Sequence, residues 1–202
     1  RPQKITFNGY NWRVPENEVF VDFETLSDDF ADFTQLPHQP STDMIFMIGV
    51  GYRTGTKFTY RNFICKSPTY DEEYRIMDEF AQFIAERNFP RIYYWVAETR
   101  FWDLSTSRQQ ERMESLNDFE RRDQILSKWL LGNWADLFEM FKTEPIVIQG
   151  CYKFGLKAIA TAMRKHGMIK SRMDSKCQSG MTAMVNAWKS YHQTDDPSNS
   201  SI

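Results

Sequence analysis

Two carboxylates stand inside an otherwise apolar stretch near the start of the chain, VFVDFE at residues 19–24. The valines and phenylalanines predict a short strand that is buried on both faces. Asp22 and Glu24 are two residues apart, and in a strand this spacing puts both side chains on the same face. Because unpaired charges inside a protein cost several kcal/mol each, basic side chains or a cation must lie against them.

Acidic and basic residues are separated along the chain, although the net charge is only −2. No Lys or Arg occurs between Arg13 and Arg53, so the Asp22–Glu24 pair has no nearby counter-ion in the sequence. Positive charge gathers later, at Lys153, Lys157, Arg164, Lys165, Lys170, Arg172 and Lys176. Two solvated faces would explain each half alone, but the combination is typical of a protein that holds a cation at one place and phosphates at another.

Length and composition favour a globular protein with one large domain, or one domain with decorations. The 202 residues are 41% apolar and 15% aromatic, which suffices for a sizeable core. The start lacks an initiator Met and a signal pattern, which is typical of a piece of a longer chain. The sequence contains no run of about 18 apolar residues, which is the length that a membrane-spanning helix needs. The cysteines (Cys65, Cys151 and Cys177) form no CxxC pair, so we expect no disulfide framework, no thiolate zinc site, and a reducing, cytoplasmic location.

The order of apolar patterns predicts strands first and helices later. After residues 19–24, apolar runs at 44–53 and 57–65 flank Thr-Gly-Thr and predict a hairpin, which gives three adjacent antiparallel strands. Residues 67–89 begin with a capping Ser or Thr and carry apolar side chains at helical spacing. The strand predicted at 91–96 follows this crossover and should lie parallel to an existing strand. The later segments predicted to be helical are 120–142 and 156–166.

Five short motifs, in order along the chain, resemble the ribonuclease H-like DEDD superfamily of 3'-5' exonucleases. They are VFVDFET (19–25), IYYWVAE (92–98), WADLF (134–138), GLKAIA (155–160) and SGMTAM (179–184). The arrangement is similar to the ribonuclease H-like family found beside RecB-type nuclease and helicase domains in bacteria and large DNA viruses. The resemblance implies a mixed sheet, three antiparallel strands plus a parallel one, flanked by helices.

The same resemblance implies a metal-dependent nuclease that acts on DNA, in the 3'-5' direction and on single strands. Besides nucleic acid, the resemblance implies one further partner, a helicase or a RecB-type nuclease that is fused to the chain or associated with it. The YYWV version of the second motif replaces a more usual His-containing one, and a final acid is hard to find. These departures leave an alternative open, an inactive relative that only binds nucleic acid or docks onto a partner nuclease or helicase.

Phosphodiester hydrolysis explains why the family needs carboxylates. Two divalent ions activate the attacking water and stabilise the leaving oxygen, and Mg²⁺ and Mn²⁺ prefer carboxylate oxygens. On the resemblance, Asp22 bridges the ions, Glu24 lies beside it and Glu98 is the third ligand. The alternative for Glu98 is an acid placed at a helix N-terminus by the helix dipole. Asp136 is a reserve ligand whose alternative role is a helix cap.

Three further residues are candidates for substrate binding. Lys157 stands at a predicted helix start, where it could hold a phosphate together with backbone amides, or be an ordinary surface lysine. Arg164 belongs to the same basic segment and would add a phosphate contact. Trp95 could stack on a base, although an aromatic residue at a strand end also suits the core.

DEDD nucleases close their site with a late helix that carries a Tyr or His and then an Asp. Tyr191 and Asp195 have the Tyr-type spacing, but Pro197 follows at once and predicts a frayed end. We therefore expect the third motif to lie beyond residue 202 and the present chain to have little activity, since an incomplete cage holds metal weakly. The alternative is that Tyr191 and Asp195 are this motif. The predicted organisation is an entry segment at 1–14, the nuclease domain at 15–190 and a polar tail at 191–202.

Overall fold

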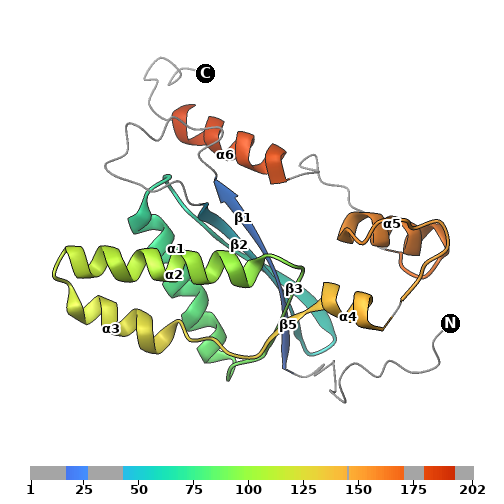
Figure 1. Ribbon diagram of the computed structural model, residues 1–202, viewed down its shortest axis with the longest axis horizontal. Coiled ribbons are helices and arrows are strands. Elements are labelled where there is room, and N and C mark those ends of the chain that lie inside the picture. The colour runs from blue at the N-terminus through green and yellow to red at the C-terminus, as the bar shows by residue number, and fades with distance from the viewer. Residues whose placement is uncertain (1–16, 27–42, 145, 171–179, 194–202) are drawn as a thin grey trace.

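A computed structural model describes residues 17–26, 43–144, 146–170 and 180–193 of the chain. These residues form a mixed sheet with helices packed around it (Figure 1). The elements follow in the order β1 (Glu18–Leu26), β2 (Met44–Thr54), β3 (Lys57–Ile64), α1 (Tyr70–Glu86), β4 (Arg91–Tyr94), α2 (Glu98–Ser115), α3 (Phe119–Lys128), β5 (Trp134–Asp136), α4 (Leu137–Thr143), α5 (Leu156–Lys165) and α6 (Gly180–Gln193).

The sheet has the strand order β3-β2-β1-β4-β5. β1 and β2 are antiparallel, as are β2 and β3, whereas β4 lies parallel to β1 and β5 parallel to β4. This confirms the predicted fold class, a mixed α/β sheet with three antiparallel strands and a parallel strand. The hairpin is confirmed too, and it turns at Gly55, whose φ of 62° suits glycine.

One predicted helix is wrong. Residues 120–142 are not a single helix, because α3 ends at Lys128 and the chain then forms β5 before α4 begins. Gly132 and Asn133 both have positive φ, 58° and 51°, which breaks helical geometry between the two helices. Strand β5 has only three residues, which is too few to show the alternation by which strands are recognised.

Helix α1 has the predicted cap and apolar stripe. The Thr69 side chain accepts a hydrogen bond from the Glu72 N–H at 3.4 Å, and Ile76, Met77 and Phe80 are fully buried. Helix α6 runs to Gln193, so the first residues of the predicted tail are helical.

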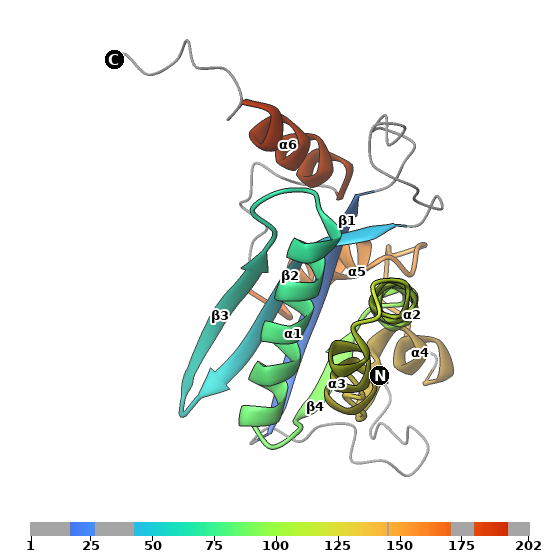
Figure 2. The ribbon, with the colours of Figure 1, turned by 90° about the vertical axis from the view of Figure 1, so that its left-hand side faces the viewer.

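The two faces of β1 differ, which corrects the prediction that this strand is buried on both. Val19, Val21 and Phe23 are buried, and the Phe23 ring packs 6.0 Å from Phe80 of α1 and 6.3 Å from Trp102 of α2, centroid to centroid. On the opposite face Asp22 is exposed. Figures 1 and 2 show why: α1, α2 and α3 lie on one side of the sheet, whereas α5 lies on the other and α6 crosses the end of β1.

A buried polar cluster joins α1, α2 and β2. Glu73 is fully buried, and its Oε1 accepts hydrogen bonds from Arg108 Nη2 at 2.6 Å, Ser105 Oγ at 2.8 Å and the Ile45 N–H at 2.9 Å. Its Oε2 accepts from Gln109 Nε2 at 2.9 Å. Because the buried charge is paired and hydrogen-bonded on both oxygens, it links the two helices to the sheet without an orphaned carboxylate.

None of the helices in the described part of the chain is both long and apolar enough to cross a membrane. Cys65 and Cys151 are free thiols, and Cys177 lies outside the described residues. The cytoplasmic location stays a prediction.

Candidate functional site

Asp22 and Glu24 lie on the sheet face that α1 to α3 leave uncovered. Asp22 is exposed and Glu24 is half-buried. Strand β4 pairs with β1 only as far as Phe20, opposite Tyr93, so the two strands separate before Asp22. The β1–β2 register shifts directly after Glu24, where Phe46 is the extra residue of β2. Ligands of open α/β sheets bind near the carboxyl ends of parallel strands, and the pair lies just past the last residue pair of the parallel strands β1 and β4.

The two carboxylates share one electrostatic environment. Partial desolvation raises the pKa of Asp22, although its side chain is exposed, and the positive charge of Lys157 opposes this rise. The pKa of Glu24 is also raised, by desolvation and by the charge of Asp22, and the positive charge of Lys157 opposes this rise as well. The sequence predicts a positive charge against the two acids, and Lys157 of α5 is a positive charge that acts on both.

Glu98 is the first residue of α2 and is buried, with 6% of its surface exposed. Its Oε2 accepts hydrogen bonds from the backbone N–H groups of Trp95, at 3.2 Å, and Ala97, at 3.1 Å. Its pKa is raised to about 7, mainly by desolvation and further by the charge of Asp22, while backbone hydrogen bonds oppose the rise. The charge of Asp22 therefore acts on Glu98, whose role as the third metal ligand stays a prediction, and Glu98 also binds the backbone at the helix start, which agrees with its alternative role.

The turn that presents Glu98 is strained. Val96 has a φ of 79°, which is unfavourable for a β-branched residue, and the Ala97 N–H donates to the Trp95 carbonyl at 3.1 Å across it. Such a conformation costs on the order of 1–3 kcal/mol and persists only where its surroundings hold it. Two side chains hold it here. Glu98 accepts from the Trp95 and Ala97 N–H groups on either side of Val96, and the Val96 N–H donates to Asp136 Oδ1 at 3.2 Å.

Asp136 ends β5 and caps α4. Its Oδ1 accepts a second hydrogen bond from the Phe138 N–H at 2.8 Å. The capping role that was the alternative for Asp136 is therefore present, and a role as a metal ligand stays a prediction.

Helix α5 is fixed beside the site by a small apolar cluster. Ile159 and Ala162 of α5 and Ile148 form its buried part, and the half-buried Trp95 and Phe141 pack against it. The Trp95 ring lies 5.6 Å from that of Phe141, centroid to centroid. Trp95 thus helps to position α5, and its predicted stacking on a base stays a prediction.

Lys157 and Arg164 lie at opposite ends of α5. Lys157 is in the first turn, after the N-cap Gly155, and Arg164 is exposed in the last turn. The charge of Lys157 acts on the acidic pair, whereas Arg164 has no described link to it. Phosphate binding by either residue stays a prediction.

Helix α6 approaches the site at its start. A Cβ atom added to Gly180 would lie 3.1 Å from Glu24 Oε2, so glycine allows this close approach. Sequence reasoning cited Gly180 only within SGMTAM and missed this contact, which no local pattern shows.

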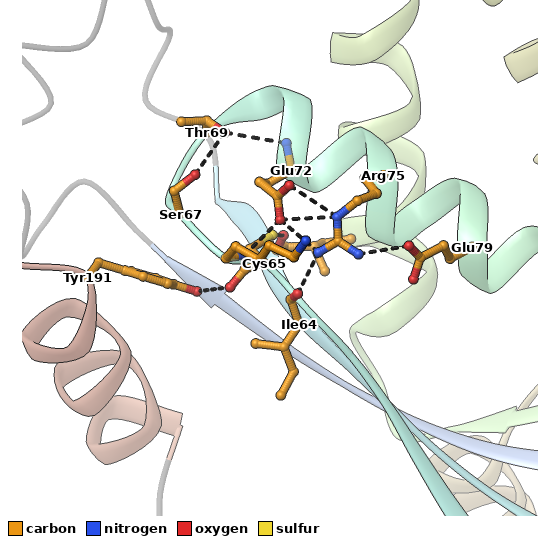
Figure 3. A network of polar contacts seen from close by, with 10 residues as sticks. Ile64, Cys65, Ser67, Thr69, Glu72, Arg75, Glu79 and Tyr191 are labelled. Carbon is orange, nitrogen blue, oxygen red and sulfur yellow. Dashed lines mark hydrogen bonds and ion pairs between the residues drawn. The ribbon is translucent and has the colours of Figure 1, made fainter. Parts of the chain in front are cut away.

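Tyr191 lies towards the other end of α6, about 16 Å further along the helix axis. Its hydroxyl donates to the Cys65 carbonyl at 2.9 Å, beside the hydrogen bonds of Glu72 and Arg75 (Figure 3). Desolvation raises the pKa of Tyr191 to about 12. Asp195 lies outside the described residues, so the assignment of these two residues as a third motif stays a prediction, and the hydroxyl of Tyr191 is engaged elsewhere.

The donor chemistry of the site fits a hard divalent cation. Asp22, Glu24 and Glu98 all have raised pKa values, and the charge of Asp22 raises the other two. A cation would relieve this repulsion. Within the described ranges, no three Asp, Glu, His or Cys side chains form a group already arranged to hold an ion. Binding of Mg²⁺ or Mn²⁺ stays a prediction.

No protein-family model, curated protein or solved structure matches the chain. The described residues define a mixed α/β protein with a five-stranded sheet flanked by helices. The resemblance to ribonuclease H-like nucleases stays a prediction from the motifs, and the strand order is consistent with it.

Proposed function

We propose that this chain is a metal-dependent nuclease of the ribonuclease H-like type, which hydrolyses phosphodiester bonds of DNA. One observation carries the proposal: Asp22 and Glu24 lie on one face of β1 where β1 and β4 separate, and the start of α2 brings Glu98 close enough for the charge of Asp22 to raise its pKa. The preference for single strands and the 3'-5' direction come from the motif resemblance.

In this mechanism Asp22, Glu24 and Glu98 are the residues that would hold two Mg²⁺ or Mn²⁺ ions. When bound, the ions supply an activated water and stabilise charge on the leaving oxygen. Lys157 contributes a positive charge beside the carboxylates and orients a substrate phosphate. The Val96 turn, held by Asp136, positions the Glu98 carboxylate, because the Trp95 and Ala97 N–H groups of this turn donate to its Oε2.

The alternative is an inactive module that binds nucleic acid or docks onto a partner helicase or RecB-type nuclease. The bonding of Glu98 favours it, because an oxygen that accepts two backbone N–H groups has a structural role without any metal. The two functions differ in whether the carboxylates bind a divalent cation.

Calorimetric titration with Mn²⁺ tests the proposal, since metal binding is required even where turnover is slow. We expect the wild type to bind Mn²⁺ and Asp22→Asn to lose most of the heat. Asp103→Asn, which changes an exposed acid on α2, is the matched control and should bind normally. Cleavage of single-stranded DNA and RNA labelled at the 3' or the 5' end then gives substrate and direction. The proposed nuclease function would be refuted if the wild type bound no Mn²⁺, or if Asp22→Asn bound Mn²⁺ as the wild type does.

A further inference from the structure

A row of aromatic rings lies on the same sheet face as the acidic pair. Gly49 and Gly51 of β2 have no side chains, and two rings of the edge strand β3 occupy the space above them. A Cβ atom on Gly51 would collide with the Phe58 ring, and one on Gly49 would collide with the Tyr60 hydroxyl. The rings therefore lie across the backbone of β2 rather than standing away from it.

These rings remain open to solvent. Phe58 is 54% exposed and Tyr60 is 59% exposed, on a face where the described helices leave them uncovered. They are supported from the side, since the Phe20 ring lies 6.2 Å from Phe58 and stacks at 5.2 Å on the buried Tyr93. Two large planar groups are thus held in place and still presented outward.

The row leads to the carboxylates. Gly49, which lies under the Tyr60 hydroxyl, is the β2 partner of Asp22. The Tyr60 hydroxyl therefore lies over the β2 residue that pairs with Asp22, beside the acidic pair. Going away from the pair, the face presents Tyr60 first and Phe58 next.

We infer that Phe58 and Tyr60 form a stacking platform for the bases of a single-stranded nucleic acid whose backbone reaches Asp22 and Glu24. Exposed rings on a sheet face bind unpaired bases by stacking, without requiring a particular sequence. The alternation of planar bases and phosphates matches an aromatic row that ends beside Lys157 and a proposed metal site. An apolar protein partner matches it less well, because the row ends at two carboxylates. This inference rests on the proposed function and locates the surface on which its substrate binds.

The test measures binding by fluorescence anisotropy in EDTA, in an Asp22→Asn background that reduces charge repulsion. The probes are a labelled oligothymidine and an abasic oligomer of equal length. Replacing Phe58 and Tyr60 together by Leu should weaken oligothymidine binding about tenfold, because leucine covers the glycines but cannot stack. Binding of the abasic oligomer should not change. The control Phe119→Leu, a similarly exposed ring on α3, should alter neither affinity.

A second variant excludes misfolding as the cause. Phe58→Tyr with Tyr60→Phe keeps both rings, so it should retain the affinity for oligothymidine. The inference is overturned if the Leu variant binds oligothymidine normally, if it loses the abasic oligomer equally, if the ring-exchanged variant also loses binding, or if the parent binds neither oligomer. A dimer of the parent that the Leu variant dissociates would assign the face to a second copy and also overturn it. The Mn²⁺ titration judges the proposed function separately.

Discussion

Glu98→Gln should remove a large part of the pH dependence of stability. The carboxyl of Glu98 has a pKa of about 7 in the native state against 4.5 in its ordinary state. Between these values the folded chain binds more protons than the unfolded chain, so stability falls as pH rises from about 4.5 to about 7. The difference corresponds to about 3 kcal/mol above pH 7, as an order of magnitude.

Glutamine is the informative replacement because its oxygen can still accept the Trp95 and Ala97 N–H groups. Urea unfolding in EDTA at about pH 5 and pH 8 gives the free energy of unfolding of each protein. We expect the wild type to lose about 3 kcal/mol more than Glu98→Gln between the two pH values. Glu111→Gln, at an exposed position of the same helix, should behave as the wild type does.

Two results would contradict this reasoning. An equal loss of stability in the wild type and in Glu98→Gln would show that the carboxyl titrates alike in the folded and unfolded chains. A gain of stability with rising pH that depends on Glu98 would mean that the native state favours the ionised form, through a positive charge not identified near it.

Three other perturbations test particular contacts. Glu73→Ala removes the carboxylate that neutralises the buried Arg108 and should lower the free energy of unfolding by about 3–5 kcal/mol in urea; a loss below about 1 kcal/mol would mean that the cluster contributes little. Val96→Gly should raise stability by about 1 kcal/mol in the same assay, since glycine tolerates positive φ, and a loss would show that the turn is unstrained. Lys157→Ala with Arg164→Ala should weaken DNA binding and reduce its salt slope by about 1–2, whereas an unchanged slope would place α5 away from the substrate.

The long, regular elements could be predicted from the sequence because their patterns repeat. The hairpin of β2 and β3, the helix α1 and the parallel strand β4 all follow from alternation, helical spacing and chain direction. Strand β5 could not be predicted, since three residues between two helices carry no period. Nor could the exposure of Asp22, because an apolar strand does not show whether a later helix covers its second face.

The candidate site was predicted in part for the same reason. Glu98 follows a strand parallel to β1, so topology alone brings it towards Asp22. The approach of Gly180 to Glu24, and of Tyr60 to the pair, depends on segments distant in sequence, and no local signal marks either contact. For Tyr60 the useful signal was the pair of glycines in β2, which leave room for rings from a neighbouring strand.

The site is divided between two structural units. Asp22 and Glu24 belong to β1 and Glu98 to α2, which packs on the sheet, whereas Lys157 belongs to a peripheral unit of α4 and α5 that the Trp95 cluster holds together. A shift of this unit as one body would change the spacing of opposite charges across the site without breaking any strand pairing. The binding strength of the site could therefore be adjusted from the apolar contacts behind α5, at positions that touch neither metal nor substrate.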